Sequence, residues 1–209
     1  MYSDLRSQFY DRYYQDRHNE ICSILLDDNH RVWLATYHKG IMRSDMPYVQ
    51  GKKLSFSKVD TGSGKSEETM LCALEDADGN LWFGNIDGTL TVCHIRTGRF
   101  VVHSLLVDGV ANRASVWALY MDNKNRLYVG TGDGLLLYNH QESTCVKLSA
   151  ERYLNEKRQP FIRAIVQTKD GTIWLGTSNM GVCRLVESAS GDEVVSKRWH
   201  NLFLCTKPR

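Results

Sequence analysis

The residues best suited to chemistry in this sequence are aromatic, amide, carboxylate and guanidinium side chains in or beside short connections between apolar runs. Aromatic rings stack on the faces of sugars, while amides, carboxylates and guanidinium groups exchange hydrogen bonds with hydroxyl groups. We therefore expect a binding surface for an oligosaccharide or another small ligand. The simpler alternative is that every candidate residue is an ordinary exposed loop residue. The candidates are Tyr37, His38, Lys39, Asn85, Asp87, Arg113, Trp117, Asp133, Arg163 and Asn179.

Patterns typical of a catalytic or metal centre are missing from the sequence. Asp76 and Asp78 resemble the start of a calcium loop, but Asp87 stands where such a loop needs a glutamate. A serine nucleophile elbow and a complete phosphate-binding loop are also missing. The histidines do not pair at metal-ligand spacing. They are His18, His30, His38, His94, His103, His140 and His200. The sequence predicts no metal, no cofactor and no catalytic residue.

Composition and charge exclude further classes of protein. The 209 residues are 42% hydrophobic and 24% charged, which is typical of a globular chain. The net charge of +2 arises from acidic and basic residues spread along the chain, so neither a nucleic acid nor direct membrane contact is predicted. No apolar run reaches the roughly 20 residues that span a bilayer, and residues 1–20 are too polar for a signal peptide. We expect a cytoplasmic chain or a piece of a longer exported protein.

Four segments of the sequence align as repeats, each with an aromatic anchor. The anchors are 49, 46 and 46 residues apart, which is the length of a propeller blade. The segments begin at Ile21, Leu71, Val116 and Ile162, and the anchors are Trp33, Trp82, Tyr128 and Trp174. Cys22 and Cys72 fall at equivalent positions in this alignment. No CxxC pair typical of a zinc or dithiol redox site is present. Equivalent positions in adjacent blades should hold Cys22 and Cys72 further apart than the roughly 7 Å between Cα atoms that a disulfide allows, so the cysteines are expected to be unpaired.

Each repeat is predicted to form strands. Asp78-Gly79 and Asp170-Gly171 tolerate positive φ in a tight turn, so the first two strands of a repeat should form an antiparallel hairpin. A glycine opens the third strand, and a fourth strand alternates apolar and polar residues. A small residue two positions after each anchor allows close packing of sheets. These small residues are Ala35, Gly84, Gly130 and Gly176.

The predicted fold is an all-β propeller of four four-stranded antiparallel blades. Seven such blades would need roughly 320 residues, so we expect an open fragment of a larger, seven-bladed propeller. A β-sandwich is the alternative, but it gives no reason for a repeated anchor. Residues 1–20 are predicted to end a preceding blade or to flank the fold, and residues 201–209 to form a tail. The blades are expected at about 21–60, 71–106, 116–149 and 162–199.

The repeat resembles the two-component regulator propeller family. The strongest matches are DGTIWLGTSNMGVCRL from Asp170 and DADGNLWFGNIDGTL from Asp76. The resemblance implies a non-catalytic part of a hybrid two-component sensor, in the periplasm of Bacteroides-type bacteria and often tuned to polysaccharide breakdown products. It also implies that kinase activity, if any, belongs to parts outside this chain. Partners would be a small ligand or oligosaccharide, and further blades or a second copy.

Two other functions stay open. The turns also resemble the Asp-box of sialidases, which is a structural turn, and virginiamycin-lyase-like enzymes use similar propeller repeats. A lyase or glycoside hydrolase would need a catalytic histidine or carboxylate pair at the channel mouth. A generic protein-interaction scaffold is the other alternative.

Overall fold

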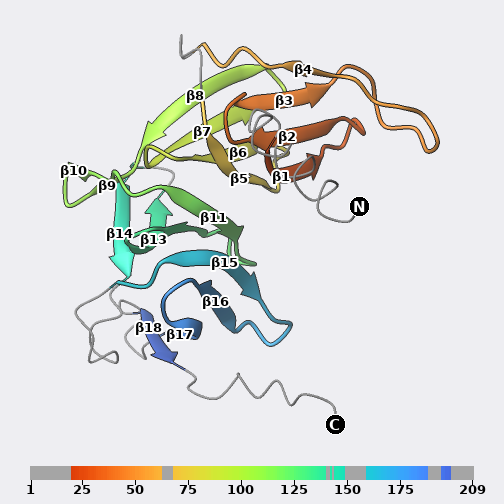
Figure 1. Ribbon diagram of the computed structural model, residues 1–209. Helices are drawn as coiled ribbons and strands as arrows, with labels where there is room; N and C mark the ends of the chain where they lie inside the picture. Colours follow the sequence, from red (N-terminus) through yellow and green to blue (C-terminus); the bar gives the residue numbers. More distant parts are fainter. Residues whose placement is uncertain are drawn as a thin grey trace, which may run out of the picture.

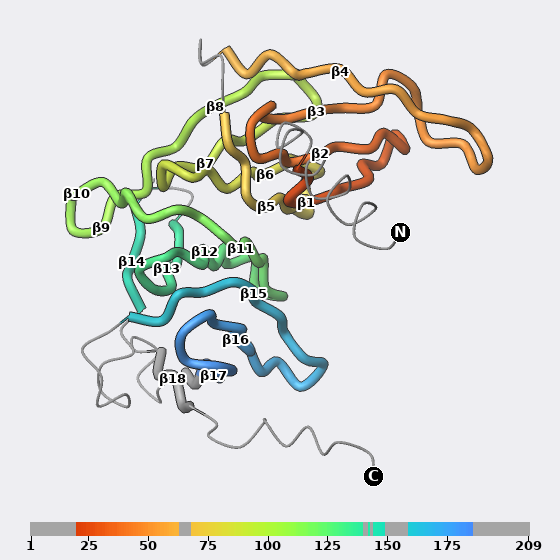
Figure 2. The backbone as a smooth tube through the Cα atoms, in the orientation of Figure 1, coloured from red at the N-terminus to blue at the C-terminus, as the bar shows by residue number. Residues whose placement is uncertain are grey.

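The computed structural model contains four antiparallel sheets that follow one another in chain order (Figure 1). It describes residues 20–62, 68–139, 142, 144–148, 159–187 and 194–198. The backbone passes from one sheet to the next without crossing back, as the colours in Figure 2 show. The described residues contain no helix. The predicted all-β propeller of four blades is therefore confirmed.

Each blade is an up-and-down sheet whose strands pair in sequence order. Blade 1 consists of β1 (Ile21–Leu26), β2 (Val32–Thr36), β3 (Ile41–Ser44) and β4 (Phe56–Lys58). Blade 2 consists of β5 (Met70–Glu75), β6 (Leu81–Asn85), β7 (Thr89–His94) and β8 (Arg99–Ser104). Blade 3 consists of β11 (Val116–Met121), β12 (Leu127–Thr131), β13 (Gly134–Asn139) and β14 (Thr144–Leu148). Blade 4 consists of β15 (Ile162–Gln167), β16 (Ile173–Thr177), β17 (Gly181–Glu187) and β18 (Val194–Arg198).

Three apolar clusters hold the blades together, one at each junction between neighbouring sheets. Trp33 packs with Phe83 between blades 1 and 2, and Trp82 packs with Tyr138 between blades 2 and 3. Tyr128 belongs to the cluster between blades 3 and 4. The first strands of neighbouring blades also contact one another. Trp33, Trp82 and Tyr128 therefore have the same role, which is to pack against the sheet that follows.

Two details differ from the expectations. The third sheet has six strands, because β9 (Leu106–Val107) and β10 (Val110–Ala111) form a small hairpin that adds parallel to the outer strand β14. Blade 2 begins one residue earlier than the alignment placed it. Met70 pairs with Asn85 as Val116 pairs with Thr131, so Leu71 is not the counterpart of Val116.

The same shift corrects the cysteine alignment. Cys72 pairs with Gly84 as Ser23 pairs with Ala35, so Cys22 and Cys72 do not occupy equivalent positions. The described cysteines are free thiols, and Cys205 lies outside the described residues. In the part of the chain that the structure describes, no helix is long and apolar enough to cross a membrane.

Candidate ligand-binding site

The two ends of each blade differ. At one end of blades 1 to 3, an aspartate holds the hairpin between the first two strands. Asp76 Oδ1 accepts hydrogen bonds from the backbone N–H groups of Asp78 and Asn80, at 3.0 and 2.8 Å. Its Oδ2 accepts one from the Trp82 indole Nε1 at 2.8 Å. Asp27 makes the same three bonds in blade 1, to Asn29, Arg31 and Trp33. The carboxylate thus joins the turn to the anchor.

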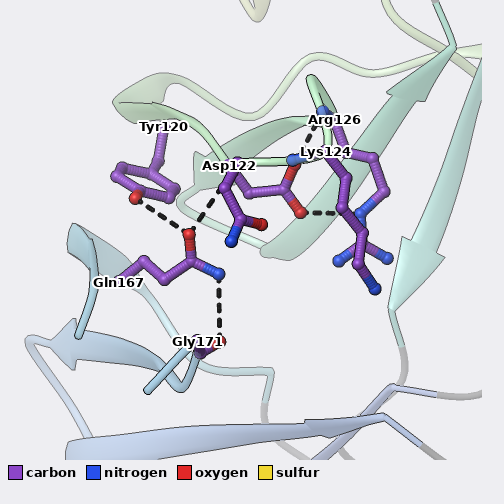
Figure 3. Close-up of polar contacts among 7 residues, drawn as sticks. Tyr120, Asp122, Lys124, Arg126, Gln167 and Gly171 are labelled. Carbon is purple, nitrogen blue, oxygen red and sulfur yellow. Dashed lines mark hydrogen bonds and ion pairs between the residues drawn. The ribbon is translucent and has the colours of Figure 1, made fainter. Parts of the chain in front are cut away.

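Blade 3 keeps this arrangement with a different partner. Asp122 Oδ1 accepts from the N–H groups of Lys124 and Arg126, as Figure 3 shows. Tyr128 has no indole N–H, and Arg126 Nε donates to Asp122 Oδ2 at 2.7 Å in its place. Gln167 of blade 4 accepts from the Tyr120 hydroxyl at 3.4 Å and donates to Gly171 O at 3.0 Å (Figure 3). Side chains at this end are therefore engaged in structural contacts.

The ionisation of Asp76 reflects the same contacts. Burial raises the pKa of Asp76, but hydrogen bonds from Trp82, Asn80 and Asp78 outweigh it and hold the pKa below its ordinary value. A carboxylate kept ionised by donors of its own hairpin is a structural clamp. This finding supports the prediction of a hairpin turn over a calcium loop. Among the described residues, no cluster of three or more histidine, cysteine, aspartate or glutamate side chains could hold a metal.

At the opposite end, two kinds of connection meet at each junction between blades. The turn between the second and third strands contacts the connection that leads to the next blade. Gly40 N donates to Glu68 O at 2.8 Å, and Asn112 Nδ2 donates to Gly88 O at 3.3 Å. A Cβ added at Gly134 would lie 3.3 Å from Gln159 Oε1 at the third junction. The turn also contacts the connection that leads into its own blade, since Phe161 N donates to Asn179 Oδ1 at 2.8 Å in blade 4. These connections form the loop end of the propeller, on which the candidate residues were expected.

A bulge in the first strand of every blade lies at this end. The register of each first strand shifts at its second residue, so that this residue has no partner in the ladder. Bulges change the direction of a side chain and occur next to functional sites. The bulged residues are Cys22, Leu71, Trp117 and Arg163. Two of the predicted site residues therefore occupy one repeated structural position.

Trp117 and Arg163 form the most distinctive contact of the loop end. The Arg163 guanidinium carbon lies 3.9 Å from the centre of the Trp117 ring and 5.2 Å from that of Phe161. The two rings are 5.6 Å apart. Arg163 is exposed and both rings are half-buried. Stacking on two rings fixes the guanidinium and leaves a positive group beside aromatic surface.

Four other candidates have structural roles in their turns. Asn85 is buried, and its amide donates to Thr89 and Thr91, at 2.7 and 3.0 Å. Asp87 accepts from the N–H and hydroxyl of Thr89.

The other two of these four lie in the turns of blades 3 and 4. Asp133 forms an ion pair with Lys147 at 2.8 Å. Asn179 donates to Gln159 O at 3.0 Å and accepts from Phe161 N. Asn179 therefore supports the Trp117 cluster indirectly, because Phe161 belongs to it.

The remaining candidates lie at the other junctions. The rings of Tyr37 and His38 are 4.8 Å apart and nearly perpendicular. The backbone of the exposed Lys39 forms an isolated parallel β-bridge with that of Glu68. Arg113 is exposed, and its backbone lies against Gly88. The structure thus divides the candidates among the junctions. The junction between blades 3 and 4 holds Trp117, Asp133, Arg163 and Asn179. Phe161 is a member that the sequence reasoning missed, although it directly precedes the first strand of blade 4.

Comparisons with known proteins agree with this fold. The sequence model of the two component regulator propeller family matches residues 64–87 and 157–179, which contain the anchors Trp82 and Trp174. The resemblance drawn from the repeats is confirmed, because the family model matches segments that contain the first two strands of blades 2 and 4. No curated protein matches the chain.

Solved structures show the same architecture. The extracellular domain of a B. thetaiotaomicron protein described as a one component system is 23% identical, with a TM-score of 0.63 over 81% of this chain and 22% of that chain. A structure described as the extracellular domain of a hybrid two component system from the same organism gives 16% identity and a TM-score of 0.67, over 87% and 25%. Virginiamycin B lyase of Staphylococcus aureus gives 14% identity and a TM-score of 0.61, over 90% and 58%. The chain thus spans about a quarter of the two extracellular domains.

Proposed function

We propose that this chain is a non-catalytic, ligand-sensing part of a two-component sensor, and that it binds an oligosaccharide or another small ligand at its loop end. The observation that carries the proposal is the Trp117, Arg163 and Phe161 cluster. An exposed guanidinium held against two rings offers a stacking surface and donors for hydroxyl or carboxylate oxygens. The family match supports the sensor role, and the extracellular relatives support a periplasmic location.

The cluster lies at a junction, which suits a sensor. Trp117 belongs to blade 3, whereas Phe161 and Arg163 belong to the start of blade 4. A ligand that contacts both blades would bind best to one spacing of the two sheets. It would therefore stabilise that arrangement of the propeller by the difference between its binding free energies for the two arrangements. Kinase activity is assigned to other domains of such a sensor.

The test is a titration of the chain with short neutral and acidic oligosaccharides, followed by calorimetry and tryptophan fluorescence. Trp117→Ala and Arg163→Ala should each weaken binding by about tenfold or more, since both remove part of the contact surface. Arg96→Ala is the matched control, because Arg96 is exposed in the turn between β7 and β8, at the hairpin end. Binding that is unchanged in both cluster variants would disprove the site. Turnover of a streptogramin B substrate would favour the lyase alternative.

A further inference from the structure

A side chain at the hairpin end connects blade 4 to blade 3. Gln167 is the last residue of β15, and its Oε1 accepts hydrogen bonds from the Tyr120 hydroxyl and the Asn123 backbone N–H, both at 3.4 Å (Figure 3). Its Nε2 donates to Gly171 O in its own hairpin at 3.0 Å. One neutral amide, which both accepts and donates, therefore joins the hairpins of two neighbouring blades.

Glu75 occupies the same position in blade 2. It pairs with Leu81 as Gln167 pairs with Ile173, and each pair is the last of its hairpin ladder. Side chains alternate between the two faces of a strand, and Ala73, two residues before Glu75, packs against the cluster between blades 1 and 2. Glu75 therefore faces blade 1, as Gln167 faces blade 3.

The hairpins around Glu75 offer the same two backbone groups. Asp28 corresponds to the N–H donor of blade 3, because each directly follows the aspartate that holds its hairpin. The Asp28 N–H has no acceptor among the described residues. Gly79 lies four residues after Glu75, as Gly171 lies four residues after Gln167. An ionised carboxylate cannot donate to the carbonyl oxygen of this glycine, whereas a protonated carboxyl group can.

Carboxylates of three neighbouring residues act on Glu75 in the folded chain. Its side chain is half-buried, and no described residue donates a hydrogen bond to it. Burial raises the pKa of Glu75, and the charges of Asp28, Asp27 and Asp76 raise it further. The ionised side chain is thus partly desolvated, repelled by its neighbours and without a donor. Protonation relieves each of these effects.

Among the described residues, no cation is directed at Glu75. The strands packed against β5 are β1, β2, β6 and β11, and they contain no Asp, Glu, His, Lys or Arg. Their titratable side chains are Cys22, at the loop end, and Tyr120, which packs towards blade 4. In blade 1, Arg31 donates to two backbone carbonyl oxygens, Arg43 lies over the ring of the anchor, and His30 is exposed. The hairpin of blade 3 lies beyond the opposite face of this sheet.

We propose that Glu75 is a pH-sensitive latch between blades 1 and 2, which closes when its carboxyl group takes up a proton. Protonated Glu75 accepts the Asp28 N–H and donates to Gly79 O, in the way that Gln167 joins blades 3 and 4. Ionised Glu75 is repelled by the carboxylates around it and leaves the junction weaker at its hairpin end. The inference does not rest on the proposed ligand site.

The direction of the pH effect follows from the pKa of Glu75. Because this pKa is higher in the folded chain than in the unfolded chain, protonation stabilises the fold. The contribution is fully present below the unfolded pKa and is lost as pH rises through the folded pKa. Mild acid should therefore tighten this junction. The effect is opposite to that of Asp76, whose pKa is lowered in the folded chain.

Thermal melts of the full chain at several pH values test the latch. Glu75→Gln carries the neutral amide of blade 4, so its melting temperature should exceed that of the wild type by about 2 °C or more at neutral pH. The difference should shrink towards zero below about pH 4, where the wild-type carboxyl group is protonated. Glu142→Gln is the control without such a trend, because Glu142 is exposed in the turn between β13 and β14. Equal melting temperatures of Glu75→Gln and wild type at neutral pH would overturn the proposal, as would a difference that stays constant with pH.

NMR titration measures the pKa of the Glu75 carboxyl group directly. This pKa should lie above the ordinary value of glutamate in the wild-type chain and should fall in Asp28→Asn, which removes one of the repelling charges. Asp108→Asn should leave it unchanged, because Asp108 is exposed in the turn between β9 and β10. A wild-type pKa at or below the ordinary value, or one that Asp28→Asn does not lower, would contradict the proposal.

Hydrogen exchange of the Asp28 amide distinguishes a hydrogen-bonded latch from simple repulsion. Relative to its intrinsic exchange rate, this amide should become more protected in the wild type as pH falls through the pKa of Glu75. In Glu75→Gln it should be protected at neutral pH as well. An Asp28 amide that stays unprotected in Glu75→Gln would show that position 75 does not act as Gln167 does, and the latch would be wrong. Circular dichroism confirms that each variant is folded.

Discussion

Blade 2 and blade 4 have almost the same central sequence, DGNLWFGN from Asp78 and DGTIWLGT from Asp170, but very different surroundings. In blade 2, Trp82 is buried and Gly84 lies against Val116 of the next blade. In blade 4, Trp174 is half-buried and Gly176 contacts only its own sheet within 4 Å. The contribution of this repeat to stability therefore depends on the blade that follows it.

The hairpins of the two blades differ as well. Asp76 of blade 2 is replaced by Thr168 in blade 4, whose hydroxyl donates to Asp170 and to Thr172 O. Asp170 Oδ1 accepts the Thr172 N–H at 3.1 Å and so replaces part of the clamp. These contacts in blade 4 are exposed to solvent, whereas the bonds of Asp76 to Asn80 and Trp82 are partly buried. Exposed hydrogen bonds contribute less, because water competes for the same groups.

The largest expected difference concerns the glycine two positions after the anchor. Gly84→Val should lower the free energy of unfolding by about 3 kcal/mol or more, because the new side chain would overlap Cys72 Sγ and Val116 Cγ1. Gly176→Val should change it by less than about 1 kcal/mol, because its Cβ meets only an ordinary contact. Urea unfolding of both variants measures the difference. Equal destabilisation would show that the face of blade 4 at Gly176 is covered.

The second difference concerns the hairpin clamp. Asp76→Ala removes four hydrogen bonds and leaves the Trp82 indole N–H without its acceptor, so a loss of about 2 to 3 kcal/mol is expected. Thr168→Ala should cost about 0.5 to 1 kcal/mol, because its bonds are exposed. Denaturant midpoints of the two variants provide the comparison. A larger loss at Thr168 would mean that burial does not decide the strength of the clamp.

A smaller effect is expected in the pH dependence of stability. The pKa of Asp76 is lower in the folded chain than in the unfolded one, so its contribution is present above the unfolded pKa of about 3.9 and is lost as pH falls through the folded pKa. The wild-type chain should therefore exceed Asp76→Asn in stability at neutral pH. The gap should narrow in acid. Thermal melts of both chains between neutral and acidic pH measure it, and a constant gap would contradict the assignment.

The smallest effect concerns the thiols at the junctions. Burial raises the pKa of Cys72 and of Cys145 to about 12, and that of Cys93 to about 11. A thiol that stays protonated is a poor nucleophile. These three cysteines should therefore react with iodoacetamide at pH 8 only after unfolding, as peptide mass mapping would show. Rapid labelling of Cys72 in the folded chain would indicate an open junction between blades 2 and 3.

Much of this architecture could be predicted from local patterns. The anchors Trp33, Trp82, Tyr128 and Trp174 and the glycines of the third strands lie where the repeats placed them. The clamp could also have been found, because an aspartate stands six residues before the anchor in three of the four repeats. The start of blade 2 was predicted one residue too late, at Leu71, because the apolar run alone does not show at which residue the strand begins. The anchor spacing would have selected Met70.

The candidate site was only partly predictable. Trp117 and Arg163 were among the expected binding residues, but their contact depends on bulges that place both side chains at the loop end. A bulge has no signature in the alternation of apolar residues, because it is defined by pairing with another strand. The structural roles of Asn85 and Asp133 likewise depend on partners that sequence position does not reveal.

The sequence by itself determined the strands, the hairpins and the repeat, since these depend on backbone preferences and side-chain alternation within a few residues. The tertiary structure alone decided which of the small residues after the anchors is covered by a side chain of the following blade. Gly130 and Gly176 occupy identical places in their repeats, yet only Gly130 receives a side chain, from Ile162 of the next blade. Packing depends on contacts between residues that are far apart in the sequence, and the local sequence pattern does not show which residues come into contact.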